Sequence, residues 1–177
     1  MKYLIISIFT LFMLLFIFAC NSDRRQNQQQ PIDQKLMEKS LVYANKQAVK
    51  LENEQIEAFI RRHNWQMKET GSGLRYSIYF DGNGPNAELG KIAVLKYRVL
   101  LIDGSEIYSS DKSGLKEFEI GRGGVESGLE EGILLMRVGD RAKFIIPSHL
   151  AFGLLGDQDK VPPKSTLIYD LELVALK

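Results

Sequence analysis

The sequence predicts an α+β protein, in which an antiparallel β-sheet wraps around one short helix and an amphipathic helix precedes the sheet. Two observations predict this class. Apolar residues recur at helical spacings as far as Trp65, and from there the pattern alternates in the manner of β-strands. A single short helical stretch, "VESGLEEGILLM", then interrupts the strands.

Length, charge and residue types narrow the function classes. The 177 residues suffice for one domain with a hydrophobic core and short extensions. The 23 Lys and Arg nearly balance the 22 Asp and Glu, so charge gives no reason to expect a nucleic-acid partner. Two His and one Cys form no metal-binding pattern, and we expect neither a metal nor a cofactor.

Residues 1–19 have the layout of an export signal, with Lys2 followed by a long apolar run. The run ends in "IFAC", which resembles the lipobox of bacterial lipoprotein signals, where the cysteine is acylated and becomes the new N-terminus. We therefore expect residues 1–19 to be a lipoprotein signal peptide and Cys20 to carry a membrane anchor. An uncleaved signal anchor is the alternative, because the run approaches the length of a membrane-spanning helix.

The next two segments differ in periodicity. Residues 20–32 are polar and have no apolar repeat, so we expect a flexible tether. Residues 33–64 lack Gly and Pro, and we expect a helix that Asp33 caps and that ends at Asn64. Apolar residues at spacings of three, four and seven support this helix: Leu41, Val42, Ala44, Ala48, Val49, Leu51, Ile56, Ala58 and Phe59. The helix packs on its own chain or, alternatively, forms a homodimer through residues 36–62.

Residues 65–177 are predicted to form the folded domain. "WQMKET" and "LRYSIYF" indicate a hairpin around "GSG", and "DG" in "LLIDGSEIYSS" indicates a second turn. In "KIAVLKYRVLL" we expect Ile92, Val94 and Tyr97 on one face. "KEFEIG", "RAKFIIP" and "TLIYDLELVAL" read as further strands. In the short helix we expect Leu129, Ile133 and Leu134 to face the sheet.

The sequence contains few candidates for a reactive catalytic group. His63 lies in the predicted helix and His149 in a loop, and we expect both to be solvated or loop-stabilising side chains. Glu130 and Glu131 are adjacent on a helix and therefore cannot act as a facing acid and base. "GRGGVESG" lacks the lysine and the glycine spacing of a phosphate loop. What remains is a set of aromatic and apolar residues at strand ends and around the short helix.

Four motifs in that set occur in order over residues 91–177. They are "AVLKYRVLLIDGSEIYSS", "FEIGRGGVESGLEEGILLMRVGDRAKFIIP", "LAFG" and "VPPKSTLIYDLELV". Together they resemble the FKBP-type peptidyl-prolyl cis-trans isomerases. The lipobox and tether ahead of such a domain resemble the FKBP lipoproteins of Bacteroidetes, some of which are associated with gliding motility.

The resemblance implies a proline-binding pocket. It implies catalytic positions at Tyr97, Phe118, Val125, Glu126, Phe152 and Tyr169, with the backbone N–H of Glu126 as the donor to the substrate carbonyl. It implies substrate-binding positions at Ile107, Tyr108, Leu129 and Val161. Pro162 and Pro163 are expected in the loop that presents Val161, since proline cannot donate to a β ladder.

The resemblance implies an isomerase that binds X-Pro segments of exported proteins and assists their folding. With Cys20 acylated, it would be a membrane-anchored lipoprotein of the bacterial cell envelope that faces the periplasm. Four positions depart from the family: Ile107 and Leu129 replace aromatic residues, Tyr108 replaces an aspartate and Phe152 replaces a tyrosine. These departures motivate an alternative, a catalytically weak proline-binding or chaperone module.

Overall fold

The computed structural model of the chain describes residues 34–177, and the predictions for residues 1–33, including Asp33 and Cys20, lie outside that range. The chain divides into two compact units between Val42 and Tyr43. The helices are α2 (Gln34–His63), α3 (Ser110–Ser113) and α4 (Ser127–Ile133), with a 3-10 turn at Ser148–Leu150. The strands are β1 (Lys68–Glu69), β2 (Arg75–Phe80), β3 (Ile92–Leu101), β4 (Glu106–Ser109), β5 (Lys116–Glu119), β6 (Arg141–Ile146) and β7 (Leu167–Leu176).

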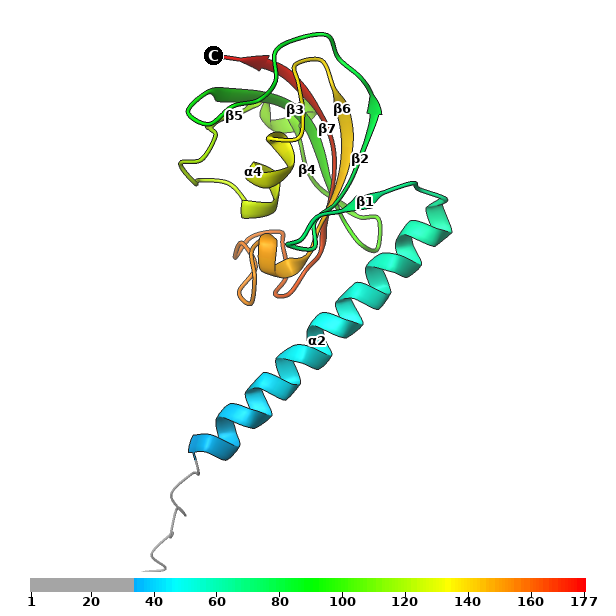
Figure 1. Cartoon of the computed structure of the whole chain (residues 1–177), viewed down its shortest axis with the longest axis vertical. Helices are drawn as coiled ribbons and strands as arrows, with labels where there is room; N and C mark the ends of the chain where they lie inside the picture. Colours follow the sequence, from blue (N-terminus) through cyan, green and yellow to red (C-terminus); the bar gives the residue numbers. More distant parts are fainter. Residues whose placement is uncertain (1–33) are drawn as a thin grey trace, which may run out of the picture. The chain divides into compact units, whose positions relative to one another are not determined.

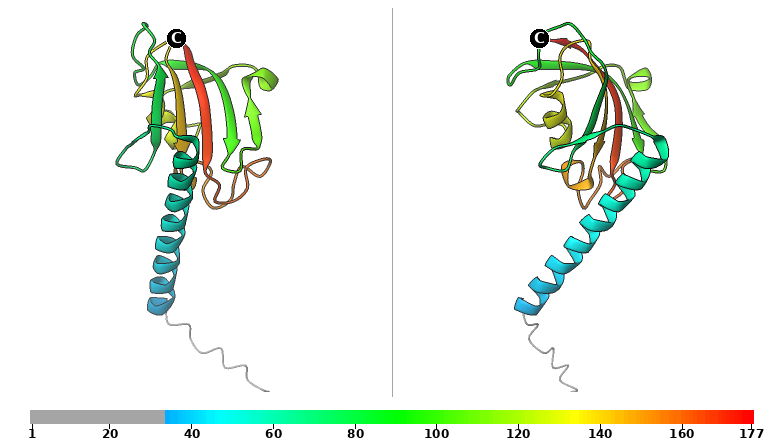
Figure 2. Two further views of the ribbon diagram at one scale, coloured as in Figure 1. Left: turned by 90° about the vertical axis from the view of Figure 1, so that its right-hand side faces the viewer. Right: turned by 45° about the vertical axis from the view of Figure 1, so that its right-hand side comes forward.

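The strands form one seven-stranded sheet in the order β1-β2-β6-β7-β3-β4, with β5 also paired to β3. Each of these pairings is antiparallel. The sheet curves around α4, as Figure 1 shows, and the left view of Figure 2, turned by 90°, shows the strands side by side. The α+β prediction and its antiparallel sheet around a short helix are therefore confirmed.

Two glycines allow α4 to approach the sheet closely. A Cβ on Gly132 would lie 2.4 Å from the Phe144 ring, and one on Gly128 would lie 2.5 Å from Ile146. Both glycines lie one turn apart on the buried side of α4, so β6 contacts the helix backbone directly. We call the face of the sheet that packs against α4 the inner face.

The residues of α4 that face the sheet differ in part from the prediction. Leu129 and Ile133 are fully buried, as expected, but Leu134 is 40% exposed. The helix ends at Ile133, so the helical spacing does not continue to Leu134. Met136, in the turn that follows, is buried in its place.

The face prediction for β3 was wrong. The strand places Ala93, Leu95, Tyr97 and Val99 on the inner face, in contact with the main core, whereas Ile92 is 38% exposed. Side chains alternate along a strand, so positions of the same parity share a face. The strand itself favoured this face, because its odd-numbered positions are all apolar whereas its even-numbered positions include Lys96 and Arg98.

The second half of α2 covers the outer face of the sheet. Ile56 and Phe59 pack against Ile145 of β6 and Ile168 of β7 in a small cluster of their own. Figure 2 shows this end of α2 in front of the strands. Asn64 adopts a left-handed conformation (φ 53°) after the last helical residue, which matches the predicted end of the helix. Packing within its own chain thus accounts for only the last turns of α2.

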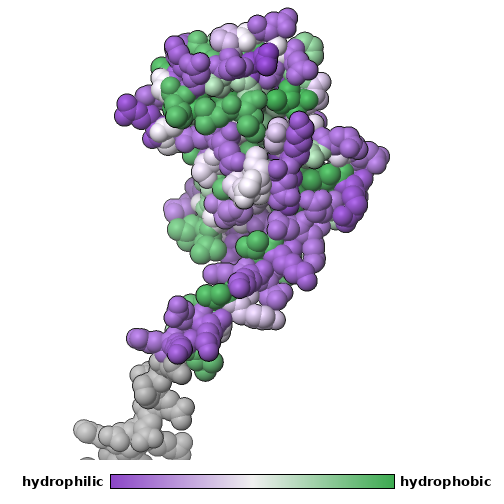
Figure 3. Space-filling model, viewed as in Figure 1, coloured by the Kyte–Doolittle hydropathy of each residue, from purple (hydrophilic) through white to green (hydrophobic). Residues whose placement is uncertain are grey.

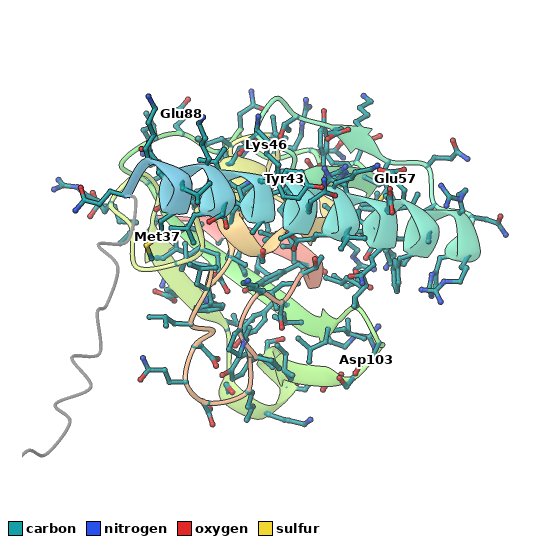
Figure 4. All side chains as sticks on the ribbon, turned by 90° about the horizontal axis from the view of Figure 1, so that it is seen from below. Met37, Tyr43, Lys46, Glu57, Glu88 and Asp103 are labelled. Carbon is teal, nitrogen blue, oxygen red and sulfur yellow. The ribbon has the colours of Figure 1, made fainter. Side chains whose placement is uncertain are left out.

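Polar contacts fix this end of α2 at two further points. The Glu52 carboxylate accepts hydrogen bonds from the Ser148 amide (2.6 Å) and the Thr166 hydroxyl (2.7 Å). The buried guanidinium of Arg75 pairs with Glu57 of α2 (3.3 Å) and Glu69 of β1 (3.2 Å). Glu57 is labelled on α2 in Figure 4. Among residues 34–177, no helix is long and apolar enough to cross a membrane.

Candidate functional site

The predicted site residues gather around the N-terminal end of α4. Val125 and Glu126 directly precede the helix, Leu129 lies in its first turn, and Tyr97 and Tyr169 approach from β3 and β7. Leu129 and Tyr169 are buried in the inner-face core, and Tyr97 and Val125 pack against it. The same core includes the other predicted residues Ile107, Tyr108, Phe118 and Val161, either buried or packed against it.

The Glu126 side chain is a buried carboxylate among these apolar groups. Its Oε1 accepts a hydrogen bond from the Tyr169 hydroxyl (2.6 Å), and its Oε2 lies 3.7 Å from the ammonium of Lys116. Only 6% of Glu126 and 1% of Tyr169 are exposed. Burial, and then the nearby Glu126 charge, raises the pKa of Tyr169 well above its ordinary value. The sequence suggested a site of aromatic and apolar side chains, but the structure adds a buried carboxylate to it.

The backbone N–H of Glu126 is available as a donor. Glu126 caps α4 in an extended conformation (φ −59°, ψ 135°), so its amide lies outside the helical ladder. No residue of the described range 34–177 accepts a hydrogen bond from this amide. An unpaired amide beside aromatic side chains is the arrangement that could receive a peptide carbonyl.

Tyr108 anchors the loop that carries Val161. Its hydroxyl donates to the Asp157 carboxylate, which also accepts from the amides of Asp159 (2.9 Å) and Val161 (2.7 Å). Burial, and then the hydrogen bond to Asp157, raises the pKa of Tyr108. Burial alone would raise the pKa of Asp157, but its hydrogen bonds hold that pKa below the ordinary value. A carboxylate therefore reaches Tyr108 from this loop.

Phe152 is the predicted site residue that lies apart from the core. Its side chain is 37% exposed, in a turn that follows Ser148–Leu150. Val161 of the same loop is buried (4%), whereas Pro162 and Pro163 are exposed and lie outside the strands. The structure thus leaves Phe152 at the surface.

Two residues that contact this site, Lys116 and Asp157, were not predicted from the sequence as site residues. Lys116 lies two positions before Phe118 on β5, so both side chains face the same side of the strand. This two-residue spacing is visible in "KEFEIG" and could have identified Lys116 as a neighbour of the site. Asp157 carried no comparable signal, because it lies in an irregular loop and reaches Tyr108 from 49 residues away.

A hollow lies on the outer face, with a volume of about 420 Å³. Phe59, Trp65 and Ile168 line part of it, and Asp103, labelled in Figure 4, lies at the turn between β3 and β4. Among the polar groups that line it, Lys143 donates to Asp170 at 2.6 Å. The hollow contains none of the predicted site residues.

Comparison with known proteins gives one family. The family described as FKBP-type peptidyl-prolyl cis-trans isomerase matches residues 84–174. The chain is 34% identical over 137 residues to the probable FKBP-type peptidyl-prolyl cis-trans isomerase FkpA of Neisseria meningitidis, covering 76% of this chain and 50% of that protein. It is 38% identical over 111 residues to an FK506-binding protein of Streptomyces anulatus, covering 61% of this chain and 90% of that protein.

Solved structures give the same fold. The crystal structure of FkpA from Escherichia coli superimposes with a TM-score of 0.64 and 29% identity, covering 88% of this chain and 73% of that one. The structure of AtFKBP13 superimposes with a TM-score of 0.61 and 30% identity, covering 64% of this chain and all of that one. Against the FkpA proteins of Neisseria meningitidis and Aeromonas hydrophila, the chain spans only about half of their length, 50% and 55%.

Proposed function

The chain belongs to the family of FKBP-type peptidyl-prolyl cis-trans isomerases, a family of isomerase enzymes, and from this membership we propose that it catalyses cis-trans isomerisation of X-Pro bonds. One observation carries the proposal. Aromatic and apolar side chains from β3, β5, β7 and α4 share one core beside Glu126, whose backbone amide has no partner within residues 34–177. The family match favours the enzyme over the alternative of a catalytically weak binding module.

The chemistry needs no reactive side chain. An X-Pro bond rotates over a barrier of roughly 18–20 kcal/mol because amide resonance holds it planar. The twisted transition state loses that resonance and its charge separation, so a site that excludes water favours it over the hydrated planar amide. The Glu126 amide would hold the substrate carbonyl while the partly exposed Tyr97 and Val125 contact the proline.

The test is a protease-coupled proline-peptide assay on the full chain in detergent, in which only the trans peptide is cleaved. We expect the wild type to accelerate isomerisation. Phe152→Ala should lower kcat/KM about tenfold if Phe152 covers the bound peptide. Phe80→Ala is the matched control, because Phe80 is also an exposed phenylalanine (55%) but lies on β2 outside the site.

Two results would contradict the enzyme proposal or its site. If the wild type leaves the uncatalysed rate unchanged, the chain is not an isomerase of these peptides, and persistent peptide binding would then support the binding module. If Phe152→Ala and Phe80→Ala have equal effects, Phe152 has no role in the site. Circular dichroism of each variant checks that it is folded.

We propose further that the protein is the lipoprotein form of this family, of the Bacteroidetes gliding-motility type, and that it acts on exported proteins at the cell envelope, facing the periplasm. The "IFAC" sequence and the polar segment 20–32 support this. Metabolic labelling with a radioactive fatty acid should label the wild type and leave Cys20→Ala unlabelled. An unlabelled wild type would favour an uncleaved signal anchor.

We propose a homodimer through residues 36–62 of α2. Leu41 and Leu51 are exposed (54% and 58%) and, with the exposed Ala44 and Ala48 between them, recur at spacings of three and four along one face. Figure 3 shows hydrophobic residues among hydrophilic ones along this helix. The heptad-like repeat favours a second copy of α2 as the occupant. In sedimentation velocity, Leu51→Lys should lower the dimer fraction. Lys46→Gln, a change at a polar position labelled in Figure 4, should not. A monomeric wild type would overturn this proposal.

A further inference from the structure

Lys116 brings a positive charge to the edge of the site. It lies on β5 with its side chain on the same side as Phe118, and its ammonium lies 5.8 Å from the centroid of the Tyr97 ring. The same ammonium lies 3.7 Å from Oε2 of Glu126. Tyr97 and Glu126 are both predicted site residues, so a substrate held between them would lie next to this charge.

The ammonium of Lys116 retains its donors. It forms an ion pair with Glu126, but 3.7 Å is too long for a hydrogen bond, and no residue in the range 34–177 accepts one from it. An ammonium carries three N–H donors. The Lys116 side chain is 30% exposed whereas that of Glu126 is 4% exposed. A bound peptide can therefore reach the cation but not the carboxylate beneath it.

The charged residues near Tyr108 differ from Lys116 in their partners. There, the Asp157 carboxylate is occupied by Tyr108 and by backbone amides. The ammonium of Lys160, an exposed residue, lies 4.9 Å from the Tyr108 ring centroid. A cation thus lies over each of the two partly exposed site tyrosines, and within residues 34–177 only Lys116 of these two lysines pairs with a carboxylate, which is buried.

We propose that Lys116 is a specificity-determining residue, which makes the site prefer X-Pro segments with an acidic side chain next to the proline. The proposal rests on the proposed function, since it names the substrate class of the same site. A carboxylate on the peptide would accept a charge-assisted hydrogen bond from the ammonium. Because Lys116 is partly exposed, the expected preference is modest, about fivefold.

The experiment compares peptides that differ at one residue beside the proline, with Glu, Gln, Lys or Leu placed either before or after it. For the full chain, both kcat/KM and affinity are measured at low and at high salt. We expect Glu to exceed Gln about fivefold on at least one side of the proline, Lys to be poorest, and the difference to shrink with salt.

Variants locate the preference. Lys116→Gln should bring the ratio between the Glu and Gln peptides to about one, and Lys116→Arg should retain it because the charge remains. The ratio is the readout, so a general loss of activity cancels. Lys50→Met is the matched control: it removes one exposed lysine from α2 and should keep the wild-type ratio. Circular dichroism checks the folding of each variant.

The outcomes separate this inference from the proposed function. Isomerisation of the Leu peptide with no preference for Glu over Gln would overturn the inference and keep the enzyme. No isomerisation of any peptide would overturn the enzyme, and the ratio of affinities would still decide the preference. A Glu preference that survives Lys116→Gln would show that another residue supplies it.

Discussion

The two faces of the sheet are stabilised in different ways. On the inner face, α4 packs through Gly128 and Gly132 onto a continuous core that contains the candidate site. On the outer face, burial is confined to a small cluster around Ile56 and Phe59, and the rest of α2 is largely exposed. The inner face thus holds the domain together, while the outer face mainly attaches the end of α2.

Each face also contains a tyrosine hydroxyl that donates to a carboxylate. Tyr169 bonds to Glu126 inside the core at 2.6 Å, whereas Tyr79 bonds to Asp170 at 2.7 Å near the surface. The lengths are nearly equal, but Tyr169 is 1% exposed and Tyr79 is 52% exposed. Because water can replace a lost surface partner but not a buried one, the environment should decide what each bond contributes.

The largest effect is expected from a pair of phenylalanine substitutions, one on each face. Phe144→Ala opens a cavity where α4 meets β6 and should lower the free energy of unfolding by about 3–5 kcal/mol. Phe59→Ala should lower it by only about 1–3 kcal/mol, because the outer cluster is small and can collapse. Urea unfolding followed by circular dichroism measures both.

Hydrogen exchange checks where each substitution acts. Phe59→Ala should raise exchange mainly in the last turns of α2, while Phe144→Ala should raise it throughout the sheet. Equal losses of stability, with exchange spread over the whole domain in both variants, would show that the two faces form one cooperative core.

The tyrosine pair gives the next largest difference. Tyr169→Phe leaves the buried Glu126 carboxylate without its donor and should cost about 1.5–3 kcal/mol of unfolding free energy. Tyr79→Phe should change it by about 0.5 kcal/mol or less, since Asp170 keeps its bond to Lys143 (2.6 Å) and its access to water. A loss for Tyr79→Phe as large as that for Tyr169→Phe would contradict the burial argument.

The sequence predicted the strands and the short helix, because strand and helix periods record which side chains are buried, and it predicted the cluster of site residues only through its resemblance to the family. It could not predict the polar contacts within that cluster. The Glu126–Tyr169 bond joins residues 43 positions apart, and neither residue type signals the other in the sequence. The β3 face could have been predicted, because Lys96 and Arg98 mark the even-numbered positions as the face away from the core.

A smaller effect is expected at the edge of the inner face, where Tyr108 fixes the loop of residues 153–165. Tyr108→Phe removes the hydrogen bond to Asp157 and should lower the unfolding free energy by about 1 kcal/mol. The loop should also be cleaved faster by a protease, because Asp157 retains only its contacts within the loop. Unchanged cleavage would show that the Val161 contacts alone hold the loop.

The smallest expected effect is the pH dependence of stability that comes from Tyr79, and it again distinguishes the Tyr79–Asp170 pair from the Tyr169–Glu126 pair. Burial, and then the hydrogen bond to Asp170, raises the pKa of Tyr79 from 10.0 to about 12. A raised pKa means that the folded state holds this proton more tightly than the unfolded state does. The resulting stabilisation is therefore complete below pH 10 and is lost as the pH rises through about 12.

Spectrophotometric titration can follow this difference, with Tyr79→Phe as the reference. The wild type should show one additional tyrosine that ionises near pH 12 while the domain is still folded. Tyr169 should ionise only when the domain unfolds, because burial and Glu126 raise its pKa well above the ordinary value. If Tyr79 ionises at the pH of an exposed tyrosine, its bond to Asp170 does not stabilise the folded state.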